Sequence, residues 1–134
     1  MKEVRYKRVL LKLSGESLKG DKSHGVDPKA LDYMAQEIKS ITELGVELGI
    51  VVGGGNIWRG SEAELEGMDR ATADYAGMLA TVISAVALQE SLESKHKLDT
   101  RTMSSMNIQA VAEPYIRRRA IRHLEKKREG LFAA

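Results

Sequence analysis

The chain has 134 residues, the length of one ordinary domain with a sizeable buried core. Its 43% hydrophobic and 30% charged residues exclude an intrinsically disordered chain. A formal net charge of +2 and an aromatic content of 4% argue against a nucleic-acid-binding protein. The absence of cysteine excludes a disulfide framework, a cysteine-ligated zinc site and a thiol nucleophile.

No metal site, targeting segment or membrane span is predicted. The three histidines, His24, His96 and His123, lie far apart and lack metal-ligand spacing. The longest mostly apolar run, 76–88, is shorter than the roughly 20 residues that cross a bilayer. The apolar stretch near the N-terminus is too short for the core of a signal peptide. We therefore expect a cytoplasmic protein without a membrane partner.

The first half of the chain predicts a strand, a helix and a second strand. The apolar run 9–13 is typical of a strand buried in a parallel sheet, and a polar loop follows it. Asp27 and Pro28 predict the start of an amphipathic helix that ends at Gly45. The apolar run 46–52 predicts the second strand. Together they form a βαβ unit, whose crossover should be right-handed.

A long helix dominates the middle of the chain. Residues 57–67 predict one helical turn and a loop, and Asp69 is the expected N-cap of a helix from Arg70 to about Glu93. This helix is apolar on nearly every side, so we expect it to pack on its own sheet and against another subunit.

The last third predicts shorter elements. We expect a strand over 98–103, a short helix over 108–112 and a helix from Pro114 to about Lys127. Residues 131–134 predict the beginning of a strand. The whole chain, 1–134, is therefore predicted to be a single α/β domain with a mainly parallel sheet.

The first place for chemistry is the end of the first strand, where Lys12 is followed by Ser14 and Gly15. Ligands of open α/β sheets bind at the carboxyl ends of the strands. A lysine there neutralises phosphate charge, and the small Ser-Gly pair lets backbone N–H groups approach phosphate oxygens. The alternative interpretation is an ordinary turn beside a solvated lysine.

The second place is the run 53–55 of three glycines, followed by Asn56 and, three residues later, Arg59. Glycines admit a close backbone approach, and arginine binds phosphate through its planar fork. The run is neither a dinucleotide fingerprint nor a Walker A motif. A tight turn is the alternative. Because both loops follow parallel strands of one βαβ unit, they predict a nucleotide site suited to phosphoryl transfer with Mg²⁺.

These motifs resemble a known family, the bacterial uridylate (UMP) kinases. The resemblance rests on KLSGE at 12–16, VVGGGNIWRG at 51–60, MDRATADYAGMLATVI at 68–83, RTMSSM at 101–106 and EPYIRRRAIRHLEKKR at 113–128, all in the family's order. It implies the amino-acid-kinase fold, a three-layer α/β sandwich. It also implies transfer of the γ-phosphate of ATP to UMP to give UDP, with Mg²⁺.

The resemblance also implies roles for individual residues. Lys12 would be catalytic and stabilise the transferring group. The ATP-binding residues would be Lys12, Leu13, Ser14, Gly15, Gly55 and Arg59. Gly54 and Asp74 would bind UMP, although Asp74 also suits an ion pair with Arg70 one helical turn away. A GTP effector would act through Gly20, Asp21, Lys22, Ser23, His24 and Gly25, for which the alternative is a mobile polar loop.

The chain departs from the family in length. Family members are about twice as long, and their second half carries a loop that grips UMP, a catalytic aspartate and the adenine-binding part. We therefore expect the N-terminal, phosphate-acceptor half of the fold, incomplete at its C-terminus and inactive alone. A second chain would complete it. A homo-oligomer, hexameric in the family, is also implied. The stretch 128–130 is polar where the family often has an apolar strand.

Three alternatives stay open. One is another kinase of the same fold, acting on a carboxylate, a carbamate or a small phosphate ester. Another is a non-catalytic oligomerisation fragment that associates through the helix 70–93. In that case Val82→Asp should dissociate the subunits. The basic stretch 117–128 could serve a nucleic-acid module, but its apolar stripe favours a solvated or oligomer-facing helix.

Overall fold

The computed structural model describes residues 3–134, without the side chains of residues 60, 61 and 64. Five parallel strands form one sheet in the order β1-β2-β5-β3-β4. The strands are β1 (Arg8–Leu13), β2 (Glu47–Val52), β3 (Thr100–Ser104), β4 (Glu113–Pro114) and β5 (Glu129–Ala133). The predicted α/β fold with a parallel sheet is confirmed.

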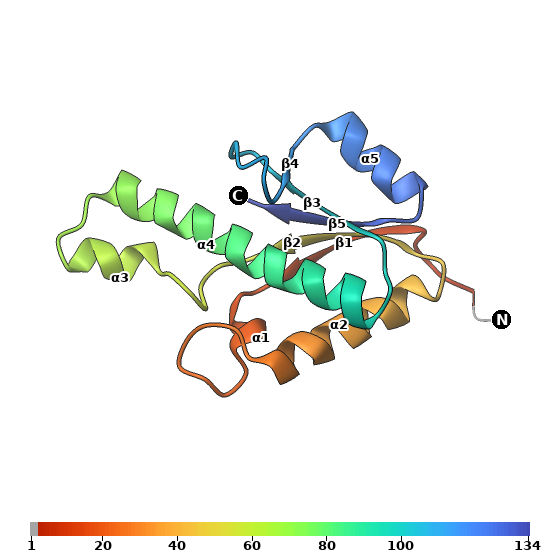
Figure 1. Cartoon of the computed structure of the whole chain (residues 1–134), viewed down its shortest axis with the longest axis horizontal. Helices are drawn as coiled ribbons and strands as arrows, with labels where there is room; N and C mark the ends of the chain where they lie inside the picture. Colours follow the sequence, from red (N-terminus) through yellow and green to blue (C-terminus); the bar gives the residue numbers. More distant parts are fainter. Residues whose placement is uncertain (1–2) are drawn as a thin grey trace.

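Helices cover both faces of the sheet, which gives the predicted three layers (Figure 1). The helices are α1 (Glu16–Lys19), α2 (Pro28–Thr42), α3 (Gly60–Leu65), α4 (Arg70–Glu90) and α5 (Arg117–Glu125). A π-helical turn, η1 (Ser91–Lys95), continues α4. Helices α2 and α4 lie on one face, and α5 lies on the other (Figure 1).

Side chains alternate along the strands and so sort into two layers. Leu48, Ile50 and Leu131 are fully buried and face α2 and α4, where they form the main core. Their neighbours Val51 and Phe132 face the side that carries α5. The main core is therefore on the α2/α4 side of the sheet.

The predicted caps of the two long helices are confirmed. The side chain of Asp27 accepts a hydrogen bond from the Ala30 nitrogen at 3.2 Å, at the start of α2. Asp69 accepts one from the Thr72 nitrogen at 3.1 Å, at the start of α4. Such caps satisfy N–H groups that have no partner inside the helix.

Three local predictions are wrong. The segment 108–112 is a turn rather than a helix, closed by bonds from the Val111 and Ala112 nitrogens to the Ile108 oxygen. Pro114 lies in the short strand β4, because the φ angle of proline also suits an edge strand. Helix α5 consequently begins at Arg117. The segment predicted as a loop after β1 contains α1.

Helix α4 is buried on one side and exposed on the other. Val82 is 5% exposed and belongs to the core, whereas Ile83 is 53% exposed. The expectation that Val82→Asp dissociates subunits is therefore wrong, because this side chain faces the sheet. The segment 70–95 is long and apolar enough to cross a membrane by length and composition. In this fold it packs along β3 and β5 as a core helix.

Candidate functional site

The two predicted loops meet at the carboxyl ends of β1 and β2. The strands pair in register up to Leu13 and Val52, so both chains leave the sheet at the same edge. The Gly53 nitrogen then donates a hydrogen bond to the Leu13 oxygen at 2.8 Å. The prediction that both loops open on one edge of the sheet is confirmed.

The loops touch so closely that side chains would not fit between them. A Cβ on Gly15 would lie 2.8 Å from the Gly55 nitrogen and 2.4 Å from the Asn56 Oδ1. A Cβ on Gly53 would lie 3.0 Å from the Gly15 nitrogen. These glycines are required for the contact between the two loops, a requirement that only the three-dimensional arrangement makes visible.

Gly54 is packed against helix α4. A Cβ at this position would lie 2.7 Å from the Thr81 nitrogen and 2.9 Å from the Ala80 carbonyl carbon. The middle of α4 thus approaches the glycine loop backbone to backbone. Gly55 is different, because its nearest non-neighbouring atoms belong to the Arg59 guanidinium, at 3.5 Å from a Cβ built there.

Two cationic side chains lie at this edge. Lys12 is exposed near the end of β1, on the same face of the sheet as Leu10. Arg59 is about half exposed and forms an ion pair with Glu16, the first residue of α1. The side chain of Leu13 is buried in the core, so only its backbone is available to a ligand. The Ser14 hydroxyl accepts a hydrogen bond from the Glu16 nitrogen at 3.2 Å.

Asn56 joins three segments of the site. It is 2% exposed, and its Nδ2 donates to the Gly25 oxygen at 2.9 Å. Its Oδ1 accepts a hydrogen bond from the Ser84 hydroxyl of α4 at 3.1 Å, and its backbone oxygen accepts one from the Gly25 nitrogen at 2.7 Å. Asn56 belongs to the glycine-loop motif but was not predicted as a site residue. The only signal in the sequence was its position directly after the glycines.

Asp74 lies away from this meeting point. It is on α4 about six residues before Ala80, which is roughly 9 Å along the helix axis. Both of its carboxylate oxygens accept hydrogen bonds from the Arg70 Nε, at 3.1 and 3.2 Å. The ion pair that was its alternative interpretation is therefore present. The structure does not bring Asp74 next to Gly54.

The segment Gly20 to Gly25 projects from the site as an exposed loop. Gly25 anchors one end through Asn56, while Lys22 donates to the Val26 oxygen at 3.4 Å. His24 contacts the Ser23 hydroxyl at 3.1 Å. Among the side chains that the structure describes, no group of three or more histidine, aspartate or glutamate residues could hold a metal ion.

Comparisons with known proteins agree with this geometry. The sequence pattern of the Amino acid kinase family matches residues 7–129. The chain belongs to the amino acid kinase family.

Within that family, the chain is similar to uridylate kinases. It is 54% identical to a uridylate kinase of Pediococcus pentosaceus, over all of this chain and 55% of that protein. The crystal structure of UMP kinase from Bacillus anthracis matches with a TM-score of 0.90 and 47% identity, over 96% of this chain and 52% of that chain. UMP kinase from Ureaplasma parvum matches with a TM-score of 0.87 and 32% identity, over 97% and 55%. The chain thus spans about half the length of these relatives.

Proposed function

We propose that the chain is the phosphate-binding part of a cytoplasmic uridylate kinase, which transfers the γ-phosphoryl group of ATP to UMP. The observation that carries the proposal is the joined edge of β1 and β2, where Lys12, the glycine loop and Arg59 gather. The 54% identity to a uridylate kinase favours this reaction over other small-molecule kinases of the fold.

The reaction needs positioning and charge neutralisation more than covalent chemistry. An oxygen of the UMP phosphate attacks the γ-phosphorus, the bond to the bridging oxygen breaks, and UDP and ADP form. Lys12 would stabilise the transferring group, because an exposed ammonium at the strand end meets the developing charge. Ser14 and Gly15 on one loop, and Gly55 and Arg59 on the other, would hold the ATP phosphates. Leu13 would contribute only its backbone.

Gly54 and Asp74 are proposed to bind UMP, in line with the family resemblance. Gly54 would act through its backbone, and Asp74 would accept a ribose hydroxyl after its bond to Arg70 opens. Mg²⁺ supplies charge neutralisation when it is bound to nucleotide phosphates. The ion would be carried on the nucleotide phosphates, as is usual for Mg²⁺ in kinase sites.

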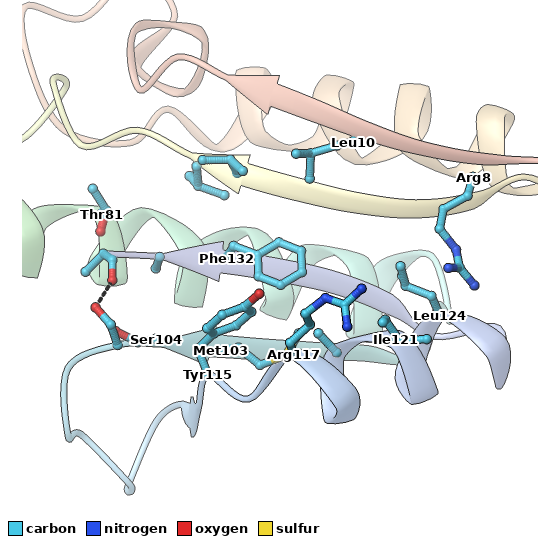
Figure 2. A pocket seen from close by; sticks show the side chains of 16 residues that line it. Arg8, Leu10, Thr81, Met103, Ser104, Tyr115, Arg117, Ile121, Leu124 and Phe132 are labelled. Atoms are coloured by element: carbon cyan, nitrogen blue, oxygen red, sulfur yellow. Dashed lines mark hydrogen bonds between the residues drawn. The ribbon is translucent and has the colours of Figure 1, made fainter. Parts of the chain in front are cut away.

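We also propose that polypeptide outside these 134 residues packs on the open side of the sheet. An apolar groove of about 680 Å³ lies between α5 and the sheet (Figure 2). Leu10, on the edge strand β1, is 65% exposed in this groove, and Phe132 and Tyr115 meet edge to face with ring centres 5.9 Å apart. An uncovered apolar face beside an unpaired edge strand is suited to further chain packing on it.

A coupled assay with ATP and UMP tests the function. The 134-residue chain alone should form no UDP. Activity should return when the part of the Pediococcus pentosaceus kinase outside the matched 55% is added. In the restored enzyme, Lys12→Ala should lower kcat by about 10²-fold or more, while Lys29→Ala, at an exposed position on α2, should leave it unchanged. UDP formation by the chain alone, or full activity of Lys12→Ala, would contradict the proposal.

A homo-oligomer through α4 is proposed as well. Exposed apolar side chains line its outer face at helical spacing, namely Tyr75, Leu79, Ile83 and Val86. Such a stripe favours contact with a second copy of the chain. It also supports the second candidate function, a non-catalytic role in oligomerisation. The two candidates differ in the coupled assay, because only the kinase gains activity from the added polypeptide.

A GTP effector, if bound at residues 20–25, would act on the site through Asn56.

A further inference from the structure

A buried carboxyl group lies at the opposite end of the sheet from the phosphate loops. Glu129 is the first residue of β5 and is 2% exposed. Strand β5 lies between β2 and β3, so Glu129 starts an inner strand of the sheet. Nothing in the proposed kinase reaction uses it.

The hydrogen bonds around Glu129 raise the question of which group donates the hydrogen between Glu129 and Thr42. Its Oε1 lies 2.6 Å from the Thr42 Oγ1, in the last turn of α2. The same Thr42 hydroxyl lies 3.0 Å from the Ile38 carbonyl oxygen, which only accepts. A threonine hydroxyl carries a single hydrogen, so it cannot serve both oxygens fully. If the hydroxyl donates to Ile38, the hydrogen in the shorter contact comes from the Glu129 carboxyl.

The second carboxyl oxygen supports the same protonation state. Glu129 Oε2 is buried and has no hydrogen-bond partner within the described part of the chain. An ionised carboxylate in this position would leave a charged oxygen without a donor, which costs far more than leaving a neutral carbonyl oxygen. Burial raises the pKa of Glu129 accordingly, and the nearby charge of Asp99 adds to the increase. A hydrogen bond that Thr42 donated to the carboxylate would instead lower the pKa.

The charged neighbours do not compensate a carboxylate here. Lys127 binds Glu47 on β2 at 3.5 Å, and Arg8 binds the same carboxylate at 2.7 Å. Arg128 binds Asp99, the residue before β3, at 3.3 Å, and also contacts the ring of His123 on α5. The end of α2 adds Lys39 and Glu43, neither of which bonds to Glu129 within residues 3–134.

We propose that Glu129 is a pH-sensitive latch between β5 and α2: the neutral acid donates a hydrogen bond to Thr42 Oγ1, and ionisation of the acid breaks this contact. A cavity of about 250 Å³ adjoins the pair. It is lined by Thr42 and Glu129, by Gly45, Val46 and Leu48, and by the charged residues Glu47, Lys127 and Arg128. It gives water a place from which to solvate the carboxylate once the proton is lost.

The sign of the effect follows from linkage. The folded chain holds the proton more tightly than the unfolded chain, whose glutamate has the ordinary pKa of 4.5. The stabilisation is therefore complete below that value and is lost as the pH rises through the folded-state pKa. This loss is independent of nucleotide binding, so it can be measured whether or not the chain forms a kinase.

Urea unfolding of the 134-residue chain from about pH 3.5 to about pH 9 tests the latch. Glu129→Gln keeps a donor toward Thr42 but cannot ionise. The ratio of its folding equilibrium constant to that of the unchanged chain should be constant below the unfolded-state pKa of 4.5. Between that value and the folded-state pKa it should rise by up to about tenfold per pH unit, and above the folded-state pKa it should level off. Glu43→Gln, an exposed carboxyl at the end of α2, should give a flat ratio.

A spectroscopic measurement keeps the test decisive if folding is impaired. The side-chain carboxyl carbon of Glu129, followed by ¹³C NMR, should titrate above the exposed glutamates. Thr42→Val should move its titration further than Thr42→Ser, because only serine keeps the hydroxyl. A flat ratio for Glu129→Gln, or a Glu129 carbon that titrates together with the exposed glutamates, would overturn the proposal.

Discussion

Gly54 lies against the backbone of Thr81, at a distance that leaves no room for a Cβ atom. The atom would fall 2.7 Å from the Thr81 nitrogen, which belongs to a regular helix and cannot move alone. The glycine loop and α4 are thus fixed to each other through backbone atoms. This contact determines where the loop after β2 turns, and it makes a specific demand on the sequence at residue 54.

Gly54→Ala should therefore destabilise the fold by about 1–3 kcal/mol, the usual cost of overpacking. Gly55→Ala is the matched control, because its added Cβ meets only the end of the Arg59 side chain, in ordinary van der Waals contact at 3.5 Å. Urea unfolding of both variants measures the difference. Equal stabilities of the two variants would show that the backbone of α4 shifts to accommodate the added Cβ, contrary to our expectation.

The carboxyl-edge site could be predicted in outline because parallel strands of one βαβ unit end at the same edge. Lys12, Gly15 and Arg59 came together for that reason. Asn56 could not be predicted, since its partners Gly25 and Ser84 are 31 and 28 residues away in sequence. Long-range hydrogen bonds leave no periodic trace in a single sequence.

The same contrast explains the elements that were predicted correctly and those that were missed. Helices α2 and α4 have side-chain caps and an apolar pattern several turns long, so their starts were clear. Helix α1 has four residues and no side-chain cap, and it is held by the loop contact rather than by its own pattern. At Pro114 the fixed φ angle fits two structures, and pairing with Ser104 decided in favour of the strand.

Asn56→Ala should lower the free energy of unfolding by about 1–3 kcal/mol, because it leaves buried partners unsatisfied. It should also raise the hydrogen exchange of the segment 20–25, whose attachment at Gly25 includes the Asn56 side chain. Ser84→Ala removes only the bond to α4 and serves as the control. In that variant the loop should exchange as in the unchanged chain. Faster hydrogen exchange of residues 20–25 in the Ser84→Ala variant than in the unchanged chain would contradict this account.

The two faces of α4 predict opposite outcomes for neighbouring residues. Ile83→Asp, at an exposed position, should leave the fold intact and lower the sedimentation coefficient if subunits associate through this stripe. Val82→Asp should unfold the chain, because it buries a charge in the core. Sedimentation velocity combined with circular dichroism separates these results. An unchanged sedimentation profile for Ile83→Asp would exclude α4 as the oligomer contact.

Glu47 should make the fold sensitive to acid, in the opposite sense to Glu129. The hydrogen bond from Arg8 Nε, at 2.7 Å, holds the pKa of Glu47 below its usual value of 4.5, and the charge of Lys127 contributes. A lowered folded-state pKa gives a stabilisation that is present above pH 4.5 and lost as the pH falls through the folded-state value.

Glu47→Gln should therefore cost roughly 1 kcal/mol or less at neutral pH and nothing at the acid end. The comparison is an acid titration of the unchanged chain and the variant, followed by circular dichroism. Glu43→Gln, whose carboxyl is exposed, should reproduce the unchanged curve. Glu47 and Glu129 both line the cavity at this end of the sheet. Their titrations therefore set the lower and upper limits of the pH range in which they stabilise the fold most. A Glu47→Gln curve parallel to that of the unchanged chain would assign the acid sensitivity to other carboxylates.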